Sequence, residues 1–145
     1  MIEIVPYEPE HIDQIMEHPR IWEIKTSLCS EWEDWKKRRK EEGPAYTLMV
    51  DGYPLGCAGV LIMDNNIGEA WMILSSLFNN YKKLIYSALK KNLDAIISEH
   101  RLVGVQAFID PEFEKAKHMI EHLGFTEDGL VMLSGMPMIR FWRAC

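Results

Sequence analysis

Apolar and polar residues alternate in some stretches of this chain and recur at helical spacing in others, which predicts a mixed α and β fold. In residues 67–76, Glu69, Trp71 and Ile73 fall on one face of an expected strand. From about residue 80 to residue 97, apolar residues form a single helical stripe. A strand that leads through a short turn into a helix favours ligand binding, because the helix N-terminus presents unpaired N–H groups and partial positive charge.

The other elements follow from the same patterns and from the signals at their ends. Further strands are expected over residues 2–6, 45–50, 53–63, 102–109, 127–133 and 136–142. Further helices are expected to begin at Pro9, at a capping box formed by Ser30 and Glu33, and at Asp110-Pro111. The result is an α/β (α+β) chain in which helices flank a central sheet.

The connections predict how the strands pair. Asp51-Gly52 between two apolar runs indicates a hairpin. Strands 67–76 and 102–109 are joined by a helix, so they should be parallel with a right-handed crossover, and the remaining strands should be largely antiparallel. Residues 20–28 fit either a short helical turn or an apolar lid.

Composition narrows the class of protein. The chain has 145 residues, 48% of them hydrophobic and 26% charged, which is typical of one globular domain. A net charge of −6 argues against nucleic acid as the main partner. No apolar run reaches membrane-spanning length, and the three cysteines form no C-x-x-C pair. We therefore expect a cytoplasmic protein with reduced thiols and no membrane partner.

Glu69 is the main candidate for chemistry. A carboxylate close to an amine can take up its proton, and burial beside Trp71 would make Glu69 a better base. The alternative is that Glu69 lies at an exposed strand end and pairs with a nearby lysine.

Two other motifs are interpreted as structural. His118 and His122 match an inverted zinc-protease pattern, but they lie opposite the apolar stripe and no third ligand is evident, so no metal site is predicted. The five consecutive basic residues 36–40 are interpreted as a solvated helix face, with an anion site as the alternative.

The predicted element order resembles that of the GNAT superfamily of acyl-CoA-dependent N-acetyltransferases. Two local pieces carry the resemblance: residues 68–73, and Ala116 followed by Leu123-Gly124-Phe125. The resemblance implies a mixed, mostly antiparallel sheet with acetyl-CoA between parallel strands four and five. It also implies an amine acceptor, Glu69 as general base, a backbone N–H of strand four holding the acyl carbonyl, and a possible homodimer formed through the C-terminal strands.

The resemblance also implies where the cofactor binds. By position, the cofactor-binding residues are Ile73, Leu74, Ser75, Asn79, Asn80, Tyr81, Lys82, Lys83 and Phe113. Trp22, Trp32 and Trp35 fall where the acceptor pocket is expected.

The chain departs from the family pattern at several of these positions. The glycine-rich phosphate motif falls on residues 79–84, which contain no glycine, although Lys82 and Lys83 can supply positive charge instead. Phe113 stands at the family's Asn position, and Ile120 stands at the position of the Tyr that protonates the departing thiolate.

Three hypotheses follow. The first is an N-acetyltransferase that uses acetyl-CoA, an unidentified amine and Glu69 as base. The second is a catalytically degenerate GNAT scaffold retained for binding or structure, similar to small tailed-phage proteins with a reduced scaffold. The third keeps CoA binding but loses catalysis.

Overall fold

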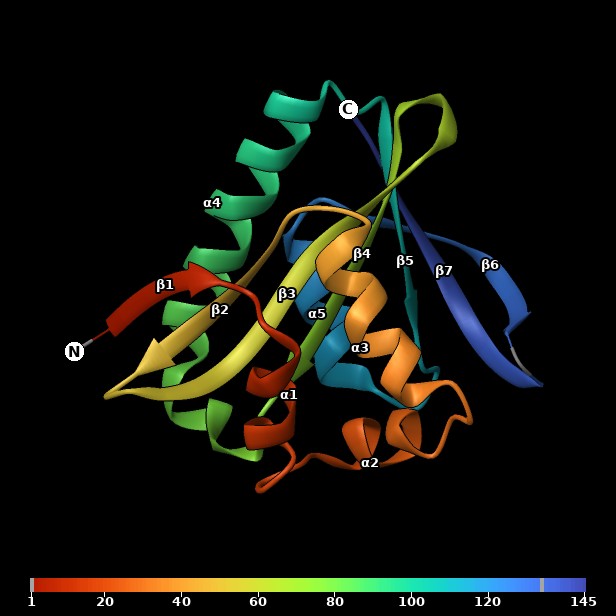
Figure 1. Cartoon of the computed structure of the whole chain (residues 1–145). Coiled ribbons are helices and arrows are strands. Elements are labelled where there is room, and N and C mark those ends of the chain that lie inside the picture. Colours follow the sequence, from red (N-terminus) through yellow and green to blue (C-terminus); the bar gives the residue numbers. More distant parts are fainter. Residues whose placement is uncertain (1, 134) are drawn as a thin grey trace.

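A seven-stranded mixed sheet forms the centre of the computed structural model, which describes residues 2–133 and 135–145 (Figure 1). The strands lie in the order β1-β2-β3-β4-β5-β7-β6. Their bounds are β1 Ile2–Pro6, β2 Ala45–Val50, β3 Tyr53–Met63, β4 Ile67–Leu74, β5 Gly104–Ile109, β6 Thr126–Leu133 and β7 Met136–Ala144. Only the β4–β5 pair is parallel among these neighbours, so the predicted topology is confirmed.

Helices cover both faces of the sheet. Helices α1 Pro9–Ile15 and α3 Trp32–Glu41 cover one face, and α4 Lys82–His100 and α5 Glu114–His122 cover the other (Figure 1). Helix α2 Ile21–Ser27 lies at the end of β4 (Figure 1). Two 3₁₀ turns flank β4, η1 Asp64–Asn66 before it and η2 Ser76–Tyr81 after it. No helix in the described part of the chain combines the length and apolar character that a membrane span requires.

The predicted hairpin between β2 and β3 is confirmed. Asp51 and Gly52 have φ values of 52° and 80°, the left-handed pair that a two-residue turn between twisted strands requires. At the other expected turn, between β6 and β7, Ser134 lies outside the described residues, whereas Gly135 has a φ of 78°.

Two predicted helix starts are wrong. The helix expected at Ser30 begins at Trp32, and its N-cap residue, Glu31, makes no capping hydrogen bond. The helix expected at Asp110 begins at Glu114. Asp110 instead accepts the Glu112 backbone N–H through its side chain at 2.9 Å, so it caps an isolated turn before the helix.

In two further segments the structure corrects a predicted boundary or decides between two alternatives. The long helix begins at Lys82 rather than residue 80, because the turn η2 precedes it. Residues 20–28, which fitted either a helical turn or a lid, contain the helix α2.

Strands β4 and β5 separate beyond their first three pairs. Their parallel register joins Ile67 to Gly104 and ends where Glu69 faces Gln106. Both strands continue past that point, β4 to Leu74 and β5 to Ile109, without pairing with each other. The divergence opens the middle of the sheet, and the space it creates positions the candidate site.

The core is divided between the two faces of the sheet. On the α1 and α3 side, Tyr7, Ile12 and Ile15 pack against Trp71 and Ile73 of β4. On the α4 and α5 side, the buried cluster is built around Ile96, Val105, Ile120, Phe125 and Phe141. Each face is buried by its own helices, so the open part of the sheet is bounded by packed layers on both sides.

Replacing Ile12 by Ala should test how strongly α1 holds its face of the core. Ile12 is fully buried, so Ile12→Ala should lower the free energy of unfolding by about 2–5 kcal/mol through lost burial and a residual cavity. Leu130 on β6 is 67% exposed, and Leu130→Ala should change stability by less than about 0.5 kcal/mol. Urea unfolding checks both values, and equal losses would contradict the assignment of α1 to the core.

Candidate functional site

A cavity of about 1060 Å³ lies at the divergence of β4 and β5. It reaches both faces of the sheet, because its lining includes residues of α2 and α3 as well as α4 and α5. Among the residues expected to form the site, Glu69, Ile73, Leu74 and Phe113 line this cavity together. Trp22 and Trp35 also line it, whereas Trp32 stacks on Trp35 at 5.2 Å between ring centroids.

Glu69 is half-buried and is held in place by a chain of side-chain hydrogen bonds. Gln106 on β5 donates its amide N–H to Glu69 Oε1 at 3.1 Å, and Arg140 on β7 donates from Nε to Gln106 Oε1 at 3.1 Å. Arg140 also pairs with Asp128 on β6. Because an arginine can only donate, the Gln106 oxygen faces Arg140 and the Gln106 NH₂ group is left for Glu69.

Arg39 brings a positive charge to the same cavity. Its guanidinium stacks on Trp35, with Cζ 3.7 Å from the ring centroid, and it attracts Glu69 without forming an ion pair. Burial lowers the pKa of Arg39 to about 10, and the Glu69 carboxylate opposes that shift. The guanidinium therefore stays charged at neutral pH, so the cavity wall contains the Glu69 carboxylate and a cation, Arg39, that makes no ion pair with it.

The interpretation of residues 36–40 as a solvated face is therefore wrong for two of the five. Lys36 is buried and pairs with Asp13 at 2.6 Å, and Arg39 faces the cavity. Trp32, Trp35 and Arg39 are spaced at i, i+3 and i+7, which places them on one helix face. That spacing is the signal in the sequence that could have separated Arg39 from its exposed neighbours.

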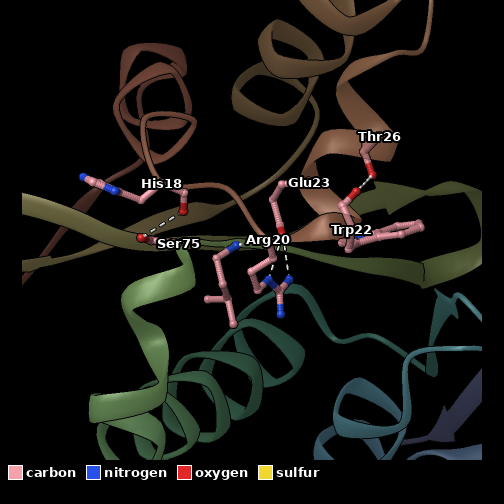
Figure 2. A network of polar contacts seen from close by, with 7 residues as sticks. His18, Arg20, Trp22, Glu23, Thr26 and Ser75 are labelled. Atoms are coloured by element: carbon pink, nitrogen blue, oxygen red, sulfur yellow. Dashed lines mark hydrogen bonds and ion pairs between the residues drawn. The ribbon is translucent and has the colours of Figure 1, made fainter.

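Helix α2 crosses the end of the cavity where β4 stops. Glu23 is fully buried, and its carboxylate accepts the backbone N–H of Leu74 at 3.1 Å. Arg20 donates two hydrogen bonds to the same carboxylate, from Nε at 2.6 Å and from Nη2 at 2.5 Å (Figure 2). The segment before α2 is attached to the end of β4 as well, since the Ser76 N–H donates to the His18 carbonyl at 2.7 Å.

Further contacts tie α2 to the far side of the opening. The Arg20 guanidinium lies over two rings, 5.2 Å from the centroid of Phe78 after β4 and 4.9 Å from that of Phe113 after β5. Lys25 pairs with Asp110 at the end of β5 at 3.3 Å. Through these contacts α2 bridges the ends of the two diverging strands.

The residues expected to hold phosphate lie elsewhere. Asn79, Asn80, Tyr81, Lys82 and Lys83 line a separate hollow of about 460 Å³ with Leu84 and with Ile2 of the edge strand. Both lysines are exposed. Ser75 is fully buried and hydrogen-bonded to the backbone of its neighbours, and it does not line the large cavity. The structure thus separates the expected phosphate residues from Glu69.

The other motifs add no site. The Cys57 thiol is buried, as expected, and burial raises its pKa to about 12. His122 Nδ1 lies 2.8 Å from the His118 carbonyl of its own helix. Within residues 2–133 and 135–145, no group of three or more His, Cys, Asp or Glu side chains is arranged to hold a metal ion.

Comparison with solved structures assigns the fold. A chimera of the Vibrio cholerae spermidine N-acetyltransferase SpeG and hSSAT matches with a TM-score of 0.74 and 13% identity, covering 99% of this chain and 95% of that one. The aminoglycoside acetyltransferase AAC(6')-Ib in complex with coenzyme A matches with a TM-score of 0.72 and 13% identity, covering 99% of this chain and 95% of that one. A GNAT-family acetyltransferase from Streptococcus pneumoniae matches with a TM-score of 0.72 and 12% identity, covering 99% of each chain.

The chain therefore has the fold of the GNAT acetyltransferases, as its element order predicted. No family model matches the sequence, and no curated protein sequence matches it. The likeness thus lies in the arrangement of strands and helices, whereas the chemistry depends on the residues of this chain.

The residues present do not fit acetyl-CoA in the arrangement that the resemblance implies. Glu23 already holds the Leu74 N–H, a strand-four amide of the kind expected to bind the acyl group. The Arg20 guanidinium lies over Phe78, which follows β4, and over Phe113, which follows β5, and its charge is neutralised by Glu23. The N-terminus of α4 begins beside the separate hollow, without the glycines that let backbone amides approach a phosphate.

Arg20 and Glu23 were missed by the sequence reasoning. Their i,i+3 spacing is compatible with an ion pair on a helix, and this was the available signal. Sequence could not reveal that the pair would be buried, because its neighbours on the strand ends, Leu74 and Phe113, are distant along the chain.

Removing the Glu23 carboxylate should strongly destabilise the fold. Glu23→Ala leaves the Arg20 charge without its partner in a site where only 9% of the Arg20 side chain is exposed. The free energy of unfolding should fall by about 3–5 kcal/mol. As a matched control, Glu42→Ala breaks an exposed pair with Arg38 and should cost less than about 1 kcal/mol. Urea unfolding checks both variants. Similar losses of unfolding free energy in the two would contradict a stabilising role for the buried Arg20–Glu23 pair of α2.

Proposed function

We propose that this chain is a GNAT-fold protein that binds an amine-bearing small molecule at Glu69 and does not use acetyl-CoA. The observation that carries the proposal is the Arg20–Glu23 pair, whose Glu23 carboxylate already accepts the Leu74 backbone N–H. An acyl group that used this N–H would have to displace a buried, doubly hydrogen-bonded ion pair.

The large cavity at the divergence of β4 and β5 supports a binding role. It is large enough for a small molecule, and one end contains a carboxylate whose orientation is fixed by Gln106. An ammonium group beside Glu69 would form a charge-assisted hydrogen bond with its carboxylate. Trp35 and Trp71 line the same end and supply ring surface against which an amine can pack.

A second candidate function is N-acetyl transfer to an amine. It is favoured by the hydrogen-bond chain from Asp128 through Arg140 and Gln106 to Glu69, which orients a carboxylate where the resemblance expects a base. The solved structures with this fold named above include a spermidine N-acetyltransferase and an aminoglycoside acetyltransferase. In this candidate Glu69 would remove the proton from the attacking amine.

Calorimetry with acetyl-CoA and free CoA should separate the two candidates. We expect no binding heat and no change in Tm. A ligand at 100 times its Kd would add about 2.7 kcal/mol of stability, which would raise the Tm of a domain of this size by several degrees. A shift of that kind with both ligands would contradict the proposal and favour acetyl transfer.

Release of free thiol from acetyl-CoA, with spermidine or kanamycin as acceptor, provides the second readout. We expect no release above the buffer rate. If release occurred and Glu69→Gln abolished it without lowering Tm, the second candidate would replace the first. Glu99→Gln is the matched control, because Glu99 is an exposed carboxylate near the end of α4 and lies outside the cavity lining.

A further inference from the structure

The geometry points to a ligand that carries both an ammonium group and a carboxylate on a small apolar body, as a hydrophobic α-amino acid does. This inference rests on the proposed function, because it names the ligand chemistry for the same cavity. In this arrangement the ammonium group lies against Glu69 and the carboxylate lies against Arg39.

Arg39 supplies a positive charge in the cavity wall. Its guanidinium belongs to a group of rings, since Arg39 stacks on Trp35, and Trp35 meets Trp71 edge-on with centroids 5.6 Å apart. Among the described residues, Arg39 Nε and Trp71 Nε1 are the buried side-chain nitrogen or oxygen atoms that lack a hydrogen-bond partner, and both are closed to solvent. The ligand carboxylate therefore pairs with the rest of the Arg39 guanidinium, whose charge is opposite to its own.

The other charges around the cavity are already paired or exposed. Arg20 pairs with Glu23, Lys25 pairs with Asp110, and Glu31 is exposed to solvent. Arg39 and Glu69 remain, separated by more than the 4.0 Å of an ion pair. A zwitterion adds no net charge and gives each of the two groups an opposite partner, whereas a lone amine leaves Arg39 unmatched and a lone carboxylate leaves Glu69 unmatched.

The rest of the cavity suits an apolar side chain. Between the sheet and the two helices on its far side, the lining is built from Met72, Leu89, Leu93, Met119 and Ile120. Methionine side chains adapt to irregular shapes, so this part of the cavity can accept hydrophobic side chains of different form. By contrast, polycations such as spermidine would place additional positive charge close to Arg39.

Isothermal titration calorimetry with matched probes tests the inference. The probes are L-leucine, L-methionine, L-phenylalanine and L-tryptophan, each compared with the amine that lacks its carboxylate. At least one amino acid should bind the full chain, and the corresponding amine should bind at least tenfold more weakly. Arg39→Gln should weaken amino-acid binding at least tenfold and should not weaken amine binding, because it removes a like charge, whereas Glu69→Gln should weaken both.

Controls keep the test independent of folding. Arg38→Gln removes the neighbouring guanidinium, which is exposed and paired with Glu42, and it should leave both affinities within twofold. Arg39→Lys, which keeps the charge but not the planar donors, should bind with intermediate affinity if Tm is unchanged. The inference is overturned if no amino acid binds, if amine and amino acid bind equally, or if Arg39→Gln binds like the unmodified chain. None of these outcomes alters the acetyl-CoA result on which the proposed function depends.

Discussion

The buried ion pair between Arg20 and Glu23 is the contact on which the candidate site depends. Strands β4 and β5 diverge after Glu69, and a sheet opened in this way leaves backbone groups without partners. Glu23 satisfies one of them, the Leu74 N–H, and Arg20 neutralises the charge that this placement buries. The same helix also reaches the end of β5 through Lys25. Helix α2 thus bridges the ends of the two diverging strands and lines the cavity between them.

The large cavity has a charged end and an apolar remainder. One end has a carboxylate fixed by its hydrogen bonds and a stacked guanidinium that makes no ion pair with it, and the rest is lined by apolar side chains of β4, α4 and α5. Unpaired charge in a poorly solvated place is costly, so such a site favours ligands that bring complementary charge. Within the described residues, Glu69 and Arg39 are therefore the groups of this cavity that such a ligand would contact.

Much of the fold could be predicted from local patterns. The Asp51-Gly52 turn, the parallel crossover between β4 and β5 and the stripe of α4 all follow from short-range rules. Two helix starts were predicted wrongly, although Ser30 and Asp110 match capping signals. Helix α3 begins two residues after Ser30. The Asp110 side chain is used in a local turn and in the contact with Lys25, and the sequence pattern shows neither of these contacts.

The candidate site divides in the same way. The sequence by itself determined that Glu69 lies on a central strand and that residues 79–84 lack the glycines of a phosphate loop, because each is a property of a short segment. Only the tertiary structure decided that Glu23 holds Leu74, that Lys36 is buried and that Arg39 faces Glu69. Each of these depends on the burial of a charged side chain among residues far apart in the chain, and burial is a property of the packed whole.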